Sequence, residues 1–466
     1  MTQDREAPGD NIMGTQKISR LVLMTGLPLM LSLLINSLYN FVDSVFVAQV
    51  DEKALRALAL AAPVQQLVSS FGLGNAIGLN AVISRAMGEK DRDKVRKAAN
   101  ASIAIGVCSW LLICLICLVG ARPFFDWQAA GDEDIVRYGM DYLTICMYFS
   151  LGQMMQWVFD RFVIASGRSK LFLFTLSAAS VTNLILDPIF ILVLRLDTLG
   201  AAIATVIGQA VGAIAGILIN RRWNPEIPFD LPVRREGGRF RLTFDGRSIR
   251  DILRVGIPST LVQMLTSVVT TAMNTILQGM NAVAVSVYGV AARIMNISTV
   301  GVHGIDNGLI PIVAYNYGAK KKERIFEALK WTLIYSAAFF APFLLVLELR
   351  PDWVLDLFNA EANGLLGVGM PALRILAVAW LVMIPNLVIA AGLQGLSLGT
   401  KSMTLTLLRQ AILPLVLAWA LSFTGDLTLV WTAFIAAELI SLPYALWLWK
   451  RNTARVLRFA GGSDPA

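Results

Sequence analysis

Long apolar runs dominate this chain, and most of them reach the roughly 20 residues that a helix needs to cross a bilayer. Scanning the sequence for such runs gives twelve candidate spans. They lie at 21–47, 55–81, 99–120, 138–163, 171–194, 199–220, 251–278, 283–312, 331–350, 372–395, 403–423 and 428–449. The pattern predicts an all-α integral membrane protein with twelve transmembrane helices.

Composition supports this class, because only 15% of the 466 residues are charged and 56% are hydrophobic. Soluble domains are usually about 25% charged. Most of the 40 Lys and Arg residues fall in alternate segments between the spans, and Lys401 and Arg409 are counted among them. By the positive-inside rule, this pattern predicts that both termini are cytoplasmic. The net charge of +8 is then a topology signal and gives no indication of nucleic-acid binding.

Similar motifs recur in the two halves of the chain at a nearly constant offset of 230 to 232 residues. The matched positions are Gly26 and Gly256, Gly88 and Gly318, and Gly167 and Gly399. We interpret this as an internal duplication of six-helix units. Because six is even, both copies enter the membrane in the same direction, which is the parallel-repeat arrangement of some transporters.

The join between the copies is a Pro-rich and Arg-rich segment. We predict a first six-helix lobe at 1–220, a cytoplasmic linker at 221–250 and a second lobe at 251–466. Within the linker, 240–249 could form a short amphipathic helix on the membrane surface.

A polar stripe interrupts the first span at spacings of three and four residues, which place its members on one helix face. The stripe consists of Asn36, Tyr39, Asn40 and Asp43. A carboxylate inside a span costs roughly 2.5–3.5 kcal/mol even on mild insertion scales. Asp43 is therefore predicted to face a cavity, and Pro28 in the same helix is a candidate hinge.

The fifth span carries a second acid, within the sequence NLILDPIF. Asn183 and Asp187 are four residues apart and so share a helix face. From the helical rise, Asp43 and Asp187 both fall in the outer half of the first bundle. Together they could share a proton or hold Na⁺. The second copy has Met273 where the first has Asp43, so this chemistry belongs to the first bundle.

Other polar or soft side chains in the spans are weaker candidates, with core packing as the alternative for each. The candidates for the substrate cavity are Asn40, Gln153, Gln156, Gln263, Met264, Met273, Tyr288 and Arg293. Arg293 is open between cavity lining and interhelical pairing. The roles of His303, Asp306 and Glu438 also stay open.

Metal or redox chemistry finds little support in the sequence. Cys114 and Cys117 have C-x-x-C spacing, but they lie on an apolar helix, and His303 is the chain's one histidine. We expect no cofactor and no structural metal. An integral membrane enzyme would need clustered His, Asp or Glu near a membrane face, so we expect that the protein is not an enzyme.

Several motifs together resemble the multidrug and toxic compound extrusion (MATE) family over essentially the whole chain. They are GLPLMLSLLINSLYNFVDSVFVAQV in the first span, SRAMGEKD after the second, NLILDPIF in the fifth, GAAIATVIGQ in the sixth, RVGIPSTL in the seventh, PIVAYNYGAKK after the eighth and LQGLSLGTKS after the tenth. The resemblance implies two six-helix lobes around a V-shaped central cleft. It also implies export of amphiphilic, often cationic compounds in exchange for H⁺ or Na⁺.

In the DinF-like, proton-coupled branch of this family, acids of the first and fifth helices form the coupling site. The resemblance places that site at Asp43 and Asp187, with Asn36, Tyr39 and Asn183 as hydrogen-bond partners. It implies a monomer of the inner membrane that binds small molecules and lipid. The alternative is a lipid or polysaccharide-precursor flippase of the same superfamily, which would need a basic cavity, with Arg293 as the candidate.

Overall fold

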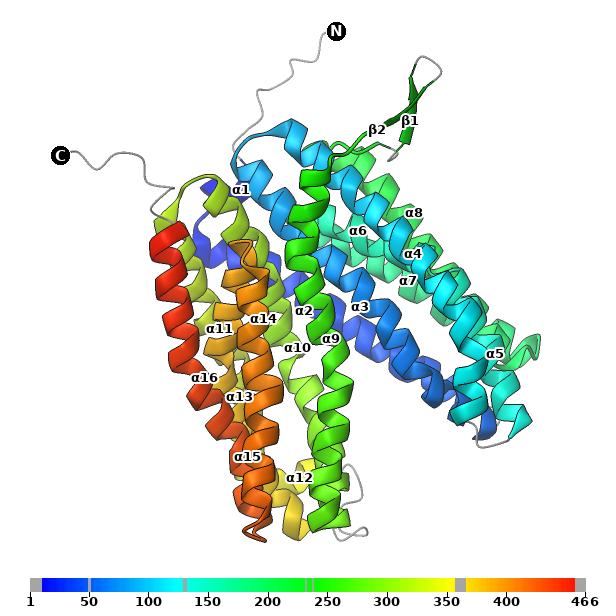
Figure 1. The fold of residues 1–466 in the computed structure, drawn as a ribbon, viewed down its shortest axis with the longest axis vertical. Coiled ribbons are helices and arrows are strands. Elements are labelled where there is room, and N and C mark those ends of the chain that lie inside the picture. Colours follow the sequence, from blue (N-terminus) through cyan, green and yellow to red (C-terminus); the bar gives the residue numbers. More distant parts are fainter. Residues whose placement is uncertain are drawn as a thin grey trace, which may run out of the picture. The chain divides into compact units, whose positions relative to one another are not determined.

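The structure is a computed structural model, shown in Figure 1. It describes residues 11–48, 52–128, 132–230, 233–236, 239–356 and 366–456. The side chains of 36–48, 52–56, 59, 192, 233–236, 239–242, 267, 282 and 455–456 lie outside the description.

Helices account for nearly all of the described chain. The first half contains α1 (Ile12–Thr15), α2 (Ile18–Ala48), α3 (Glu52–Gly88), α4 (Arg92–Gln128), α5 (Glu133–Tyr148), α6 (Leu151–Ala165), α7 (Ser169–Pro188), a π-helical turn η1 (Ile189–Val193) and α8 (Asp197–Trp223). The second half contains α9 (Gly246–Met280), α10 (Ala282–Gly318), α11 (Lys322–Leu349), α12 (Pro351–Asp356), α13 (Leu366–Gly395), α14 (Gly399–Leu407), a π-helical turn η2 (Leu408–Ile412), α15 (Leu413–Ser422) and α16 (Leu427–Val456).

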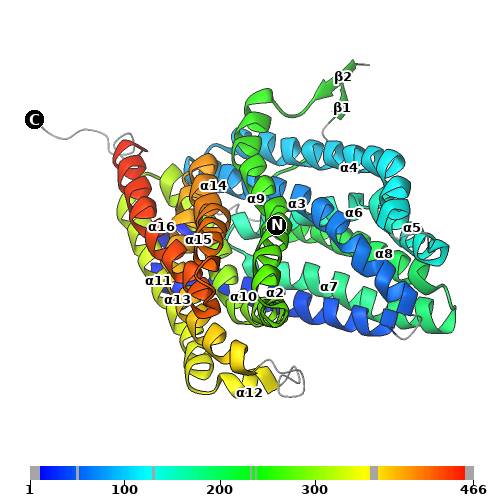
Figure 2. The same ribbon diagram turned by 60° about the horizontal axis from the view of Figure 1, so that its bottom comes forward.

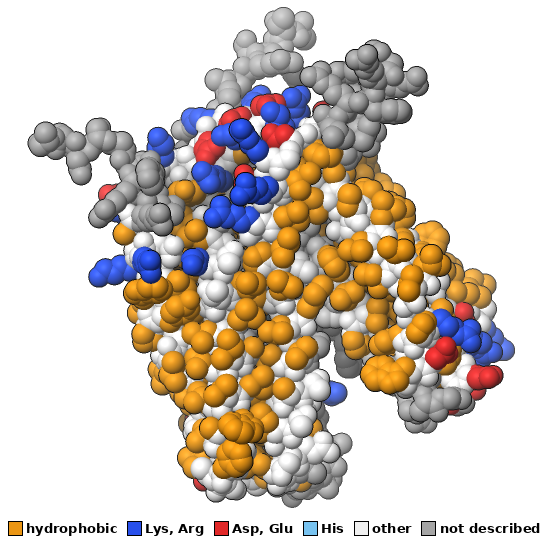
Figure 3. Space-filling model, in the orientation of Figure 1, with side chains coloured by type: hydrophobic (Ala, Val, Ile, Leu, Met, Phe, Trp, Pro, Cys, Tyr) orange, Lys and Arg blue, Asp and Glu red, His pale blue; other side chains and the backbone are white. Residues whose placement is uncertain are grey.

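Among the described residues, 11 helical segments are long and apolar enough to cross a membrane. Their lateral faces carry large apolar side chains, which suits contact with lipid. Leu118, Val119 and Val193, for example, are exposed. In Figure 3, hydrophobic side chains cover the long sides of the helices, and Lys and Arg side chains lie near their ends.

The fourth predicted span is wrong as a single helix. Residues 138–163 are divided between α5 and α6, which are separated by Phe149 and Ser150. The break frees backbone groups, and one of them is satisfied inside the protein: the Trp110 indole N–H donates to the Tyr148 carbonyl oxygen at 2.8 Å. A membrane helix tolerates such a break when protein groups replace the lost hydrogen bonds.

The described chain groups into two units. Unit 1 holds Leu31–Thr260 with Met1–Lys17 and Ala314–Ala319, and unit 2 holds Leu261–Val313 and Lys320–Ala466 with Ile18–Met30. Three helices therefore change unit along their length, since α2 begins in unit 2, α9 begins in unit 1, and α10 begins in unit 2 and ends in unit 1. The predicted lobe boundaries stay a prediction.

Each unit contains a helix segment from the other half of the chain. A glycine forms the close contact with that segment in both units. In unit 1, a Cβ on Gly74 of α3 would lie 1.9 Å from the Thr260 hydroxyl oxygen of α9. In unit 2, a Cβ on Gly304 of α10 would lie 2.5 Å from the Met30 Cα of α2. Both members of the second pair are offset by 230 from their counterparts in the first. Only glycine leaves room for such close backbone approach.

Backbone conformation repeats at the same offset. Left-handed φ angles occur at Lys90 (57°) and Lys320 (59°), at Gly167 (82°) and Ser397 (61°), and at Arg195 (53°) and Gly425 (74°). Each pair is 230 residues apart. A left-handed φ is uncommon outside glycine, so three coincidences at one offset support the predicted internal duplication.

Unit 1 positions the predicted ion site by packing α7 and α8 side by side, as Figures 1 and 2 show. Two glycines of α8 that are four residues apart make close contacts, Gly208 with α7 and Gly212 with α6. A Cβ on Gly208 would lie 2.8 Å from the Ala179 carbonyl oxygen, and one on Gly212 would lie 2.6 Å from the Gln156 amide carbon. Small residues at this spacing let membrane helices approach closely.

The linker contains an antiparallel hairpin of β1 (Val233–Glu236) and β2 (Arg239–Leu242). The amphipathic helix expected at 240–249 is therefore wrong: β2 ends at Leu242 and α9 starts at Gly246. The buried Asn100 side chain of α4 holds both stems of the hairpin. Its amide oxygen accepts from the Asp230 N–H at 2.8 Å, and its amide nitrogen donates to the Thr243 carbonyl at 3.2 Å.

Candidate ion-coupling and substrate sites

The predicted acid of the fifth span lies in a buried polar site at the end of α7. Asp187 is 1% exposed and Asn183 is 2% exposed. The Asn183 amide donates to the Asp187 carboxylate at 3.3 Å and contacts the Thr205 hydroxyl oxygen of α8 at 3.3 Å. With the amide turned over, its nitrogen donates to the other Asp187 oxygen at 2.6 Å, and its oxygen accepts from the Thr205 N–H at 3.0 Å.

Local sequence explains why α7 ends directly after this acid, at Pro188. Pro188 directly follows Asp187 and has no N–H to continue the α-helical ladder. The chain continues as the π-helical turn η1, in which the Leu194 N–H donates to the Ile189 carbonyl oxygen at 2.9 Å. Such π turns often occur at functional sites.

The polar stripe of the first span lies in α2, whose backbone is helical from Ile18 to Ala48 with Pro28 inside it. The side chains of Asn36, Tyr39, Asn40 and Asp43 lie outside the described residues.

Two glutamines of α6 were candidates for a cavity in the first bundle. Gln156 is buried and packs against Gly212 of α8. The Gln153 amide donates to the Ser69 hydroxyl of α3 at 3.5 Å. On the same helix, Asp160 is buried and accepts a 2.5 Å hydrogen bond from the Thr175 hydroxyl of α7. All of these contacts lie within unit 1.

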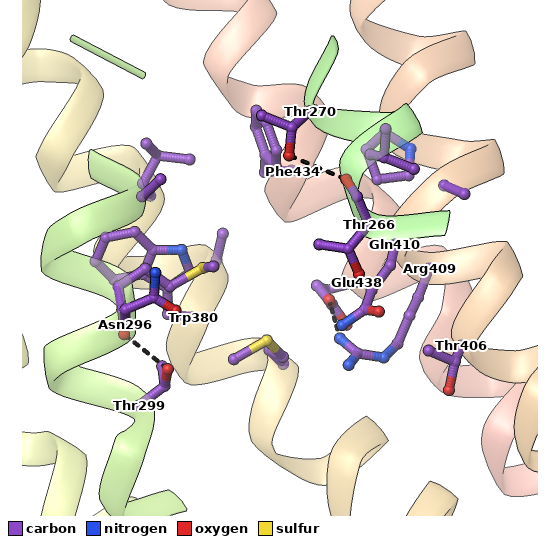
Figure 4. Close-up of a pocket in the computed structure, with 18 of the residues that line it drawn as sticks. Thr266, Thr270, Asn296, Thr299, Trp380, Thr406, Arg409, Gln410, Phe434 and Glu438 are labelled. Carbon is purple, nitrogen blue, oxygen red and sulfur yellow. Dashed lines mark hydrogen bonds and ion pairs between the residues drawn. The ribbon is translucent and has the colours of Figure 1, made fainter. Parts of the chain in front are cut away.

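Unit 2 contains a cavity of about 420 Å³. Its walls come from α9, α10, α13, the span formed by α14, η2 and α15, and α16. Figure 4 shows Trp380 and Asn296 on one side of the space and Arg409, Glu438 and Gln410 on the other. The size falls within the roughly 300–1,000 Å³ typical of small-molecule pockets.

Three helices bring charged and amide groups together at one wall of this cavity. The Arg409 guanidinium pairs with the Glu438 carboxylate at 2.6 Å, and Arg409 is 1% exposed. The Asn386 amide donates to the second Glu438 oxygen at 2.7 Å and to the Glu438 backbone carbonyl at 3.0 Å. The pair is satisfied on the carboxylate side, as a buried ion pair must be to persist.

Only some of the predicted cavity residues of the second half line this cavity. Gln263 and Tyr288 line the cavity, whereas Met264, Met273 and Arg293 are outside its wall. Met273 is fully buried and Arg293 is exposed. His303, whose role was open, lines the cavity, and Glu438 is the partner of Arg409.

Arg409 is the functional candidate that sequence reasoning missed. It was counted with the cytoplasmic segments, but it lies within the candidate span Gly399–Ser422 and is buried. Arg409 is eight residues beyond Lys401, or roughly 12 Å along a helix. Its depth in the span could have identified Arg409 from the sequence, because a guanidinium inside a span requires a partner.

A duplicated bundle of apolar helices with buried polar groups in both units defines a class: a multi-pass membrane transporter built from parallel repeats. The comparisons agree. The MatE family model matches residues 28–189 and 258–420, two segments offset by 230 residues at their starts. The chain belongs to the MatE family. It is thereby a transporter and not an enzyme, and transporters of this family need no cofactor.

Relatives and solved structures extend the match over nearly the whole chain. The chain is 24% identical over 432 residues to the multidrug export protein MepA of Staphylococcus aureus strain N315, covering 90% of this chain and 91% of that protein. It is 25% identical over 348 residues to MepA of Staphylococcus haemolyticus strain JCSC1435, covering 74% of each.

Two solved structures share the fold. One is a multidrug resistance MATE family transporter of the MOP superfamily in an outward-facing conformation, with a TM-score of 0.88, 21% identity, and coverage of 97% of this chain and 100% of that one. The other is a MOP superfamily transporter from Pyrococcus furiosus, described as having a binding pocket of reverse polarity that suggests a different function. Its TM-score is 0.87 at 20% identity, with coverage of 97% of this chain and 99% of that one. At these identities the likeness is one of fold.

Proposed function

We propose that this protein is an ion-coupled multidrug efflux antiporter, which exports amphiphilic, often cationic compounds in exchange for H⁺. Membership of the MatE family and similarity to multidrug export proteins support the transport class. The single observation that carries the coupling assignment is the buried Asp187 carboxyl with its Asn183 donor, inside a membrane span. A carboxyl in this position is costly and is the usual sign of an ion pathway.

In this proposal, Asp43 and Asp187 form the coupling site, with Asn36, Tyr39 and Asn183 as partners. Na⁺ is the alternative ion for the same carboxylates. Protonation must change which conformation is favoured, because a group that binds equally in both states drives nothing. Pro28 in α2 supports the proposal, since it lies in the helix that carries Asp43 and permits a hinge.

The energy available is sufficient for drug export. One proton moving down a potential of about 150 mV supplies roughly 3.5 kcal/mol, at about 2.3 kcal/mol per 100 mV. At 1.4 kcal/mol per factor of ten, this sustains a gradient of roughly a few hundredfold. We place the protein in the bacterial inner membrane as a monomer with both termini cytoplasmic.

Asp187→Asn tests the coupling assignment because it keeps the shape of the side chain and removes the ionisable group. We expect ethidium uptake into everted vesicles, driven by an imposed proton gradient, to fall at least about tenfold. Asp43→Asn should do the same. The matched control is Asp141→Asn, an exposed carboxyl of α5 in the same bundle, which should transport normally. Near-normal uptake by Asp187→Asn at equal expression would sink the assignment.

Separate gradients distinguish the two ions. Proteoliposomes with only a proton gradient, and others with only a Na⁺ gradient, can be compared in the same ethidium assay. We expect transport from the proton gradient alone. If transport requires a Na⁺ gradient, the same carboxylates bind Na⁺ as the coupling ion.

A further inference from the structure

The Arg409 guanidinium has N–H donors for which the described residues provide no acceptor. One of its terminal nitrogens donates to Glu438 at 2.6 Å. Its Nε and its second terminal nitrogen are buried and have no hydrogen-bond partner among the described residues. A guanidinium presents five N–H donors in a planar fork, and that fork suits the two oxygens of a carboxylate or phosphate. Buried donors are rarely left unpaired without a reason.

The Glu438 carboxylate does not accept from these two nitrogens in the observed arrangement. Both oxygens of Glu438 are already used, one by Arg409 and the other by Asn386. The remaining polar groups on the cavity wall near Arg409 include the neutral Gln410 and the Thr266 hydroxyl (Figure 4). None of these groups hydrogen-bonds the two free nitrogens of Arg409, so an anionic acceptor in the cavity would complete the site.

Three aromatic side chains, Tyr288, Trp380 and Phe434, line the cavity together with aliphatic ones. Trp380 lies across the space from Arg409 in Figure 4. Tyr288 stacks with Phe434 at 6.0 Å between ring centroids, and with the buried Trp431 at 6.4 Å. Flat apolar walls with one convergent charged group favour a planar ligand whose polar end points at that group.

We infer that the unit 2 cavity binds amphiphiles that carry an oxyanion on an aromatic body, with Arg409 as the residue that recognises the oxyanion. The inference rests on the proposed transport function and names a substrate class for it. A lipid phosphate offers the same oxyanion chemistry, but about 420 Å³ suits a drug-sized ring system better than a two-chain lipid.

Asp306 is a carboxylate of the protein itself that competes with a ligand oxyanion for Arg409. It is a buried residue of α10, one turn from His303, and both of its carboxylate oxygens have no partner among the described residues. It is also within electrostatic reach of Arg409. Asp306→Asn removes this competitor, so we expect the oxyanion ligand to bind more tightly to this variant than to the wild type.

The test compares two probes that differ only in the anionic group. Dansylglycine carries a carboxylate on an aromatic body, and its methyl ester does not. We expect the purified wild-type protein in nanodiscs to bind dansylglycine at least about tenfold more tightly than the ester, which is the scale of one hydrogen bond to a charged group.

Arg409→Gln with Glu438→Gln should abolish this preference. The double variant avoids leaving Glu438 buried without its partner, which would endanger folding. Lys401→Gln, an exposed cation on α14, is the matched control and should keep the preference. Monodisperse elution and an unchanged melting temperature show that the double variant is folded. Asp306→Asn leaves the pair of Arg409 and Glu438 intact, so its tighter binding of dansylglycine gives a second measurement if the double variant fails to fold.

Three results would overturn the inference: equal binding of the two probes by the wild type, a preference that survives in the folded double variant, or binding of dansylglycine by Asp306→Asn that is no tighter than by the wild type. Competition by dioctanoyl phosphatidic acid at lower concentration than dansylglycine would assign the oxyanion to a lipid instead. Binding of dansylglycine does not require an ion gradient, whereas the ethidium assay does. A protein that binds dansylglycine but does not transport ethidium would therefore support this inference and contradict the proposed antiport.

Discussion

At the scale of single residues, the unit 1 site depends on the Asn183 amide. In either orientation of its amide, Asn183 donates to Asp187 and contacts Thr205 on the next helix. It therefore links the carboxyl to α8 as well as orienting it. The spacing of four in the sequence indicated the contact with Asp187, because residues i and i+4 share a helix face. The contact with Thr205 could not be read from that spacing.

Asn183→Leu should reduce proton-driven ethidium transport about tenfold, because a hydrogen bond to a charged group is worth roughly 1.5–3 kcal/mol. The initial rate of uptake in everted vesicles measures the effect. Thr182→Val is the neighbouring control, since the Thr182 hydroxyl donates to the Ala178 carbonyl of its own helix. Equal rates for Asn183→Leu and the wild type would show that the amide has no role in coupling.

At the scale of elements, breaks in the helices were harder to predict than the helices themselves. The apolar run at 138–163 gave no indication of the break between α5 and α6, because the groups that stabilise it are distant in sequence. Trp110 of α4 supplies the donor for the Tyr148 carbonyl. The π turns η1 and η2 are similar, since the sequence marks them only by a proline on one side.

Trp110→Phe keeps the ring but removes the donor at this break. Loss of this part-buried hydrogen bond costs about 0.5–1.5 kcal/mol, so we expect a measurable drop in melting temperature in detergent. Trp127→Phe changes an exposed residue at the end of the same helix and should leave the melting temperature unchanged. If both variants melt like the wild type, the Trp110 hydrogen bond does not stabilise the break.

At the scale of the whole molecule, the duplication is visible in sequence, conformation and packing at one offset. Gly88 and Gly318 form such a pair within unit 1. A Cβ on Gly88 would lie 2.0 Å from the Tyr315 carbonyl oxygen, and one on Gly318 would lie 2.1 Å from the Arg85 carbonyl oxygen. Each copy thus contributes the same glycine and the same carbonyl to a reciprocal contact.

Gly88→Leu should strongly reduce the yield of folded protein, because backbone atoms of α10 occupy the place of the new side chain. Fluorescence-detected size exclusion of a tagged protein measures the folded fraction. Gly279→Leu is the control, since nothing lies within 4 Å of a Cβ at that position. Normal yield from Gly88→Leu would contradict the close contact.

The two copies share a fold but not their chemistry. The first has a carboxyl with an amide donor at the end of α7, and the second has an ion pair and an amide drawn from η2, α16 and α13. Duplication preserved the positions that pack, whereas the polar positions diverged. The two proposed sites accordingly have different ligands.

The sequence by itself determined the membrane class, most of the helical spans, the duplication and the pairing of Asn183 with Asp187. These follow from hydrophobicity along the chain and from the helical repeat, both of which are properties of neighbouring residues. Only the tertiary structure decided that Arg409 is buried, that Glu438 and Asn386 meet it, and that Trp380 lies across a cavity from it. Such contacts depend on how far each helix is rotated and shifted against the next, and no spacing within one helix encodes that.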